Sequence, residues 1–84
     1  MPDDVGEQTR NAFRIIEQAL VEGGFGLKDV VRATYYVTDA AYFDLIVPVL
    51  GEKFGDIRPA ATMVVVSGLI RADMKVEIEV TAFK

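Results

Sequence analysis

The sequence predicts a single α+β domain, residues 1–84, whose elements follow one another in the order αβαββ. Two segments, one beginning near residue 5 and one following Asp39, repeat apolar residues at helical spacing. Two others, 30–38 and 75–83, alternate between faces as strands do, and residues 60–67 form a further, mostly apolar strand. We therefore expect a mixed sheet with both helices on one face.

The first helix is predicted to begin near residue 5, because Asp4 and Glu7 have the spacing of an N-cap and its capping-box partner. Gly23 and Gly24 are expected to end it. The apolar side of this helix should pack against another element. It is predicted to consist of Phe13, Ile16 and Leu20, with Ala12, Ile15 and Ala19 beside them.

The first strand, Val30 to Thr38, is rich in β-branched and aromatic residues. Strict alternation would direct one set of side chains to one face: Val31, Ala33, Tyr35 and Val37. The intervening residues would face the other way: Val30, Arg32, Thr34 and Tyr36.

Thr38 or Asp39 is expected to cap the second helix, and Gly55-Asp56 to close it. Its apolar stripe is predicted to be Phe43, Ile46, Leu50 and Phe54. Pro59 suits the entrance of the second strand, where its missing N–H is tolerated. A turn over Gly68 to Asp73 leads to the last strand, whose buried side chains are predicted to be Val76, Ile78, Val80 and Ala82.

The amino-acid composition argues against several classes of function. The chain has no cysteine and no histidine. This excludes disulfide bonds, serine hydrolysis that depends on a histidine, and the usual zinc ligand sets. We therefore expect no metal and no cofactor. A net charge of −4 argues against nucleic acid as the main partner. Because the chain has no long apolar run and no basic signal-peptide start, we expect it in the cytoplasm and not in a membrane.

A lone chain of this size buries a little over about 60% of its unfolded surface and is only marginally stable. A three-stranded sheet also has edges open to pairing. Two helices are not expected to cover all of Tyr35, Met63 and Val65. We therefore expect a homo-oligomer.

Two groups of polar residues are candidates for chemistry. Glu77 and Glu79 lie on the polar side of the last strand, about 6.5–7 Å apart at the backbone, which suits general acid–base work. Strand alternation alone also produces such a pair on a solvated face. Arg58, beside Pro59, could hold a carboxylate through two hydrogen bonds, or it could pair with Asp56 or a helix end.

Matching motifs run through nearly the whole chain: Gln8-Thr9-Arg10, VVRATYYVTD (Val30 to Asp39), Phe43, Phe54-Gly55, Arg58-Pro59-Ala60 and VEIEVTA (Val76 to Ala82). This combination resembles the RidA/YjgF family, the enamine/imine deaminases often labelled endoribonuclease L-PSP. The resemblance implies a chorismate mutase-like subunit, N-terminally short and equivalent to the C-terminal two thirds of the family domain. It also implies a trimer with clefts between adjacent subunits.

The resemblance assigns candidate site residues. In active relatives an arginine after Pro-Ala binds the substrate carboxylate, and a glutamate matching Glu77 positions the attacking water. Ala61 stands in the place of that arginine, or Thr62 does when the alignment is anchored on the last strand. The candidate catalytic residue is therefore Glu77, and the candidate substrate-binding residues are Arg58, Ala61 and Thr62.

These observations lead to one main hypothesis. The chain is predicted to bind a small carboxylate or an imine/keto-acid metabolite in an intersubunit cleft, with weak or absent 2-imino acid deaminase (hydrolase) activity. The alternatives are an RNA-cleaving translation inhibitor of the endoribonuclease L-PSP type and a non-catalytic structural remnant.

Overall fold

A computed structural model describes residues 4–55 and 59–83. Its helices and strands are α1 (Val5–Glu22), β1 (Val30–Val37), α2 (Phe43–Phe54), β2 (Ala60–Val65) and β3 (Val76–Ala82). Short 3₁₀ turns precede β1 and α2, at Leu27–Asp29 and Ala40–Tyr42. The predicted order αβαββ is confirmed.

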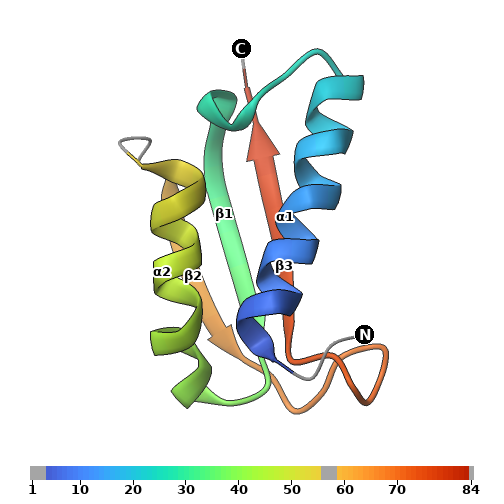
Figure 1. Ribbon diagram of the computed structural model, residues 1–84, viewed down its shortest axis with the longest axis vertical. Coiled ribbons are helices and arrows are strands. Elements are labelled where there is room, and N and C mark those ends of the chain that lie inside the picture. Colours follow the sequence, from blue (N-terminus) through green and yellow to red (C-terminus); the bar gives the residue numbers. More distant parts are fainter. Residues whose placement is uncertain (1–3, 56–58, 84) are drawn as a thin grey trace.

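The sheet has the order β2-β1-β3, with β1 parallel to β2 and antiparallel to β3. Both helices lie side by side on one face of this mixed sheet, α1 near β3 and α2 near β2 (Figure 1). The opposite face carries no helix within the described residues (Figure 1). The predicted two-layer α+β architecture is therefore confirmed.

Side-chain hydrogen bonds cap the start of α1 and of the 3₁₀ turn before α2, and glycines end both helices. The Asp4 carboxylate accepts from the Glu7 backbone N–H at 3.1 Å, so α1 begins where the N-cap predicted, and Gly23 ends it. Asp39 accepts from the Ala41 N–H at 2.9 Å, but it caps the 3₁₀ turn that precedes α2 and not α2 itself. Gly55 closes α2 with a φ of 52°, a conformation that favours glycine.

The core lies between the helices and the central strand. Phe13 from α1 is fully buried and meets Phe54 from α2 edge to face, with ring centroids 5.5 Å apart. Tyr35, Val37 and Ile46 are buried with them. Ile15 departs from the prediction, because 66% of its surface is exposed and it lies outside the packed stripe of α1.

The predicted alternation of the first strand fails at its beginning. Val30 is buried, whereas Val31 is 49% exposed, the reverse of strict alternation with Ala33, Tyr35 and Val37. The pairing register with β3 shifts between Val30 and Arg32, and such an irregularity turns the preceding side chain to the other face. From Ala33 to Val37 the predicted alternation is confirmed.

Two helices were not expected to cover all of Tyr35, Met63 and Val65, and they do not. Tyr35 is only 1% exposed and lies under the helices. Val65 is 52% exposed and Met63 is half-buried, because β2 is the outer strand of its side of the sheet. The exposed apolar residues of the sheet thus include Val65 on the outer strand β2 and Val31 at the start of the central strand β1.

Candidate functional site

An apolar groove runs between α1 and the outer edge of β3. Its volume is about 380 Å³. Ala12, Ile15 and Ile16 line it from the helix, and Val76, Glu77 and Ile78 line it from the strand. We call this cavity the Glu77 groove. Because α1 and β3 are both regular elements, the groove has rigid walls on two sides.

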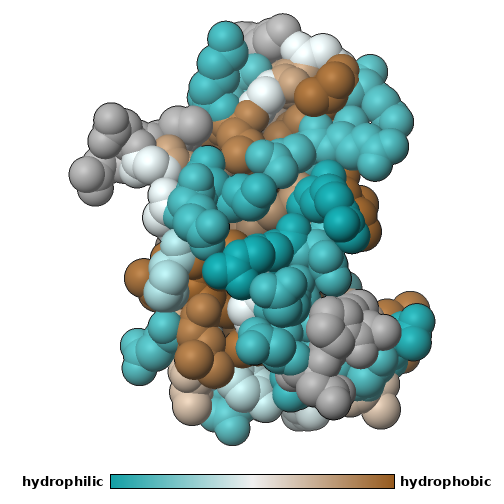
Figure 2. Space-filling model, viewed as in Figure 1, coloured by the Kyte–Doolittle hydropathy of each residue, from teal (hydrophilic) through white to brown (hydrophobic). Residues whose placement is uncertain are grey.

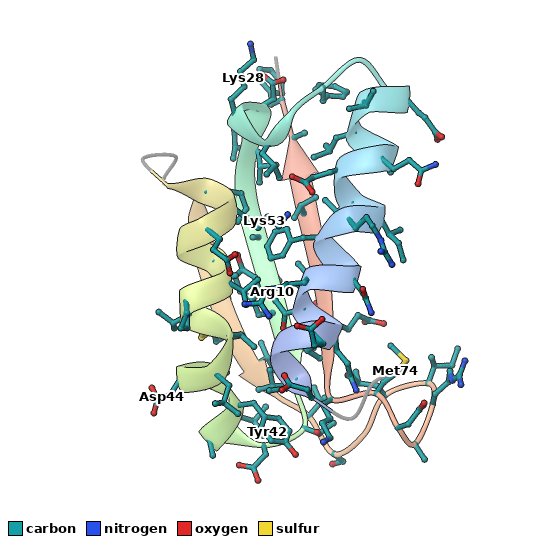
Figure 3. The ribbon with its side chains drawn as sticks, viewed as in Figure 1. Arg10, Lys28, Tyr42, Asp44, Lys53 and Met74 are labelled. Atoms are coloured by element: carbon teal, nitrogen blue, oxygen red, sulfur yellow. The ribbon has the colours of Figure 1, made fainter. Side chains whose placement is uncertain are left out.

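Gln8 lines the Glu77 groove and holds the segment around Met74 in place. This side chain is only 3% exposed, and its amide nitrogen donates to the Asp73 backbone carbonyl at 2.9 Å. Its amide oxygen accepts from the Lys75 backbone N–H at 2.7 Å. One buried amide from α1 thus holds both ends of the short segment through Met74, which lines the groove and is labelled in Figure 3.

Neighbouring elements reinforce this arrangement. The buried Thr9 hydroxyl donates to the Val5 carbonyl at 2.8 Å, within α1. Arg10 pairs with Glu7 at 2.8 Å and with Glu52 of α2 at 3.1 Å. The carboxylate of Glu52, and to a smaller extent that of Glu7, raises the pKa of Arg10. Only the contact with Glu52 joins the two helices, and because both pairs are exposed they contribute little to stability.

The strand register separates the candidate site residues between the two faces of the sheet. Ala61 is paired with Ala33, and both lie on the helix-covered face. Thr62 is paired with Thr34, and Glu77 with Tyr36, on the face without helices. Glu77 therefore shares a face with Thr62 but not with Ala61. Arg58 lies outside the described residues.

Thr62 and Glu77 are not neighbours, although they share a face. The central strand β1 lies between β2 and β3, so two strand spacings, roughly 10 Å, separate them across the sheet. A small ligand at Glu77 would therefore not also contact Thr62 of the same subunit. Glu79 is exposed on the same strand face, but it does not line the Glu77 groove.

Ala61 lines a different cavity, of about 370 Å³, between β2 and α2. Tyr35, Leu50 and Phe54 form much of its wall. Burial raises the pKa of Tyr35, so its phenol stays neutral near pH 7 and does not act as a base there. This second cavity offers an apolar wall and a phenol, but no carboxylate among its described lining residues.

We also searched the part of the chain that the structure describes for metal sites and membrane-spanning helices. No cluster of three or more potential metal-ligating side chains occurs among those residues. No helix there has the length and hydrophobicity needed to cross a bilayer.

Sequence reasoning missed two features of the site. The first is Gln8, whose contacts with residues 73 and 75 are remote in the chain; its place between Val5 and Phe13 on the buried side of α1 was the available signal. The second is the apolar wall of the Glu77 groove, where Ile15 was assigned to the packed core.

Comparison with known proteins identifies a matching family model and several relatives of the chain. The family model described as Endoribonuclease L-PSP matches residues 1–84. The RutC family protein of Pyrococcus horikoshii is 37% identical over 81 residues, which cover 96% of this chain and 64% of the relative. The 3-aminoacrylate deaminase RutC of Acinetobacter baylyi is 36% identical over 75 residues, covering 89% of this chain and 59% of the relative.

Solved structures agree with the sequence comparison. A Mycobacterium tuberculosis member of the YjgF/YER057c/UK114 family superposes with a TM-score of 0.96 at 44% identity, covering all of this chain and 71% of that one. The Rid family protein YyfA of Yersinia pestis gives a TM-score of 0.93 at 30% identity, covering 98% of this chain and 65% of that one.

The fold and the site thus define a small α+β protein of the chorismate mutase-like type. The chain belongs to the endoribonuclease L-PSP family, also known as the RidA/YjgF family, as its sequence motifs predicted. It spans 60–64% of the length of the first curated relatives that it matches.

Proposed function

We propose that the chain, as one RidA-like domain of residues 1–84, binds a small carboxylate or an imine/keto-acid metabolite in a cleft at Glu77. The observation that carries this proposal is the Glu77 groove: an apolar cavity of about 380 Å³ that Glu77 helps to line from the edge strand β3. Cavities of this size suit small molecules, and a few polar groups in an apolar lining orient them. The RutC relative named as a 3-aminoacrylate deaminase supports an enamine or imine as the ligand class.

The chemistry open to this site is hydrolysis of a carbon–nitrogen double bond. Glu77 would accept a proton from water while the water oxygen attacks the imine carbon, and would return that proton to the nitrogen to give a carbinolamine. The proton of the carbinolamine hydroxyl then passes to the nitrogen as the C–N bond breaks. The products are a keto acid and ammonia. Because the resemblance places the carboxylate-binding arginine at Ala61 or Thr62, neither of which carries a charge, the substrate lacks its anchor. The loss of such a charge-assisted contact costs about 2–5 kcal/mol, so turnover is weak or absent.

We further propose that neighbouring subunits complete the cleft in a homotrimer. Within one subunit the Glu77 groove is open on the side of the outer edge of β3, and Ile15, at 66% exposure, forms part of its wall. The helix-free face carries Thr34, Tyr36 and Val64, which are only partly exposed in the single chain. Figure 2 shows further apolar patches on the opposite, helix-covered side. Closed rings bury such surfaces equally on every subunit.

An RNA-cleaving function has less support from the structure. The helix-free face of the sheet carries Glu77 and Glu79, which repel a phosphate backbone. The net charge of −4 acts in the same direction. The name of the matched family model favours RNA cleavage, but the charge of this face and of the whole chain opposes it. We therefore do not propose this function.

An assay of ammonia release from freshly generated 2-iminopropanoate tests the proposal. Wild-type protein should accelerate release at most weakly, and Glu77→Gln should abolish whatever acceleration remains. Glu79→Gln is the matched control, because Glu79 lies on the same strand face without lining the groove, and it should behave as wild type. Robust turnover, or equal loss in both variants, would contradict the proposal.

A further inference from the structure

A separate cavity, of about 310 Å³, lies at the end of the sheet where β1 and β2 both finish. Thr38 follows β1 directly, and Ser67 follows β2 by two residues. Arg71 and Lys75 reach it from the segment between β2 and β3, and Tyr42 forms part of its wall. The carboxyl ends of parallel strands are a common position for ligand sites in open sheets.

The charge of this cavity is opposite to that of the whole chain. Two cationic residues, Arg71 and Lys75, line it, and none of its lining residues that the structure describes is Asp or Glu. Asp73 pairs with Arg71, which leaves an excess of one positive charge among these three residues. In a chain of net charge −4, this excess marks a place where an anion is favoured.

The cationic residues are held by the surrounding structure. Arg71 Nε lies 3.3 Å from Asp73 Oδ1 in an ion pair, and the guanidinium has five N–H donors in all. The Lys75 ammonium lies over the Tyr42 ring, 5.9 Å from its centroid. The Lys75 carbonyl accepts from the Thr38 N–H at 3.2 Å, while Gln8 holds the Lys75 N–H. The segment that supplies both cations is thus fixed to β1 and α1.

We propose that this cavity binds the phosphate group of a small phosphorylated metabolite. A guanidinium, an ammonium and the hydroxyls of Thr38 and Ser67 supply more donors than one carboxylate accepts, whereas the oxygens of a phosphate accept several at once. Leu69 and Met74 provide an apolar wall for the remainder of the molecule. Met74 also lines the Glu77 groove, so the two sites share one side chain.

Titration of the full chain with inorganic phosphate, followed by amide NMR at constant ionic strength, tests the proposal. Phosphate should shift amides of residues 67–75 and Thr38, with acetate and chloride as parallel titrants. Arg71→Ala should weaken phosphate binding about tenfold, as expected for the loss of a charge-assisted contact. Lys28→Ala is the control, because Lys28 is exposed at the far end of the molecule from Tyr42 and Met74 (Figure 3), and it should leave binding within twofold of wild type.

Each outcome decides the proposal. Unchanged binding in Arg71→Ala, or shifts centred on Arg10 in place of residues 67–75, would overturn the location. Equal affinity for acetate would overturn the assignment to phosphate. If the amide spectrum shows that Arg71→Ala is unfolded, Ser67→Ala replaces it, and it should weaken phosphate binding by a smaller factor while leaving the fold unchanged.

Discussion

Replacing Phe13 by alanine should lower the free energy of unfolding by about 3–5 kcal/mol, the usual cost of removing a buried aromatic side chain. Phe13 is 0% exposed and its ring meets Phe54 edge to face, so the substitution leaves a cavity between the two helices. A domain of this size is stable by roughly 0.05–0.15 kcal/mol per residue, about 4–13 kcal/mol in all, so the loss removes a large part of its stability. Urea denaturation followed by circular dichroism measures the change.

Val21→Ala is the matched control for Phe13→Ala. Val21 lies eight residues further along α1, is 70% exposed and lines none of the cavities described above, so its removal should change the stability by no more than about 0.5 kcal/mol. Because assembly contributes to apparent stability, both variants must be compared with wild type at one protein concentration. Similar losses in both variants would contradict the assigned core.

Replacing Gln8 by leucine should lower the free energy of unfolding by about 2–3 kcal/mol, because two backbone groups lose their partner in a place that water reaches poorly. The Asp73 carbonyl and the Lys75 N–H both bond to this one amide. The loss should be accompanied by faster hydrogen exchange of the Lys75 amide, measured by NMR.

Gln18→Leu makes the same chemical change on the exposed side of α1. It should leave both stability and the exchange rate of Lys75 close to wild type. If Gln8→Leu were equally harmless, the Gln8 amide would not be what holds the segment between β2 and β3.

Most of the architecture could be predicted because each helix and strand has a recognisable pattern within its own residues. The Asp4 cap, the alternation from Ala33 to Val37 and that of β3 all depend on neighbours within a few residues, and all are confirmed. The irregularity between Val30 and Arg32 was not predictable in this way. It arises from pairing with β3, about fifty residues away in the chain, which local alternation does not record.

The candidate site was predictable only in part for the same reason. Strand alternation pointed to Glu77 and Glu79, the family resemblance selected Glu77, and Glu77 is one of the residues that line a groove. Which of Ala61 and Thr62 shares its face depends on the register of β2 against β1, and this register places Thr62 there. The Gln8 contacts join residues 65 and 67 positions apart, a relation that appears only once α1 lies against β3.

The central claim is that the Glu77 cleft is completed by neighbouring subunits, and the most direct test is the mass of the wild-type protein in solution. Light scattering coupled to size-exclusion chromatography at micromolar concentration should give three times the mass of one subunit, with no change on dilution within that range. A stable, folded monomer would contradict the account, because the groove between α1 and β3 would then be open to water and no second subunit would complete it.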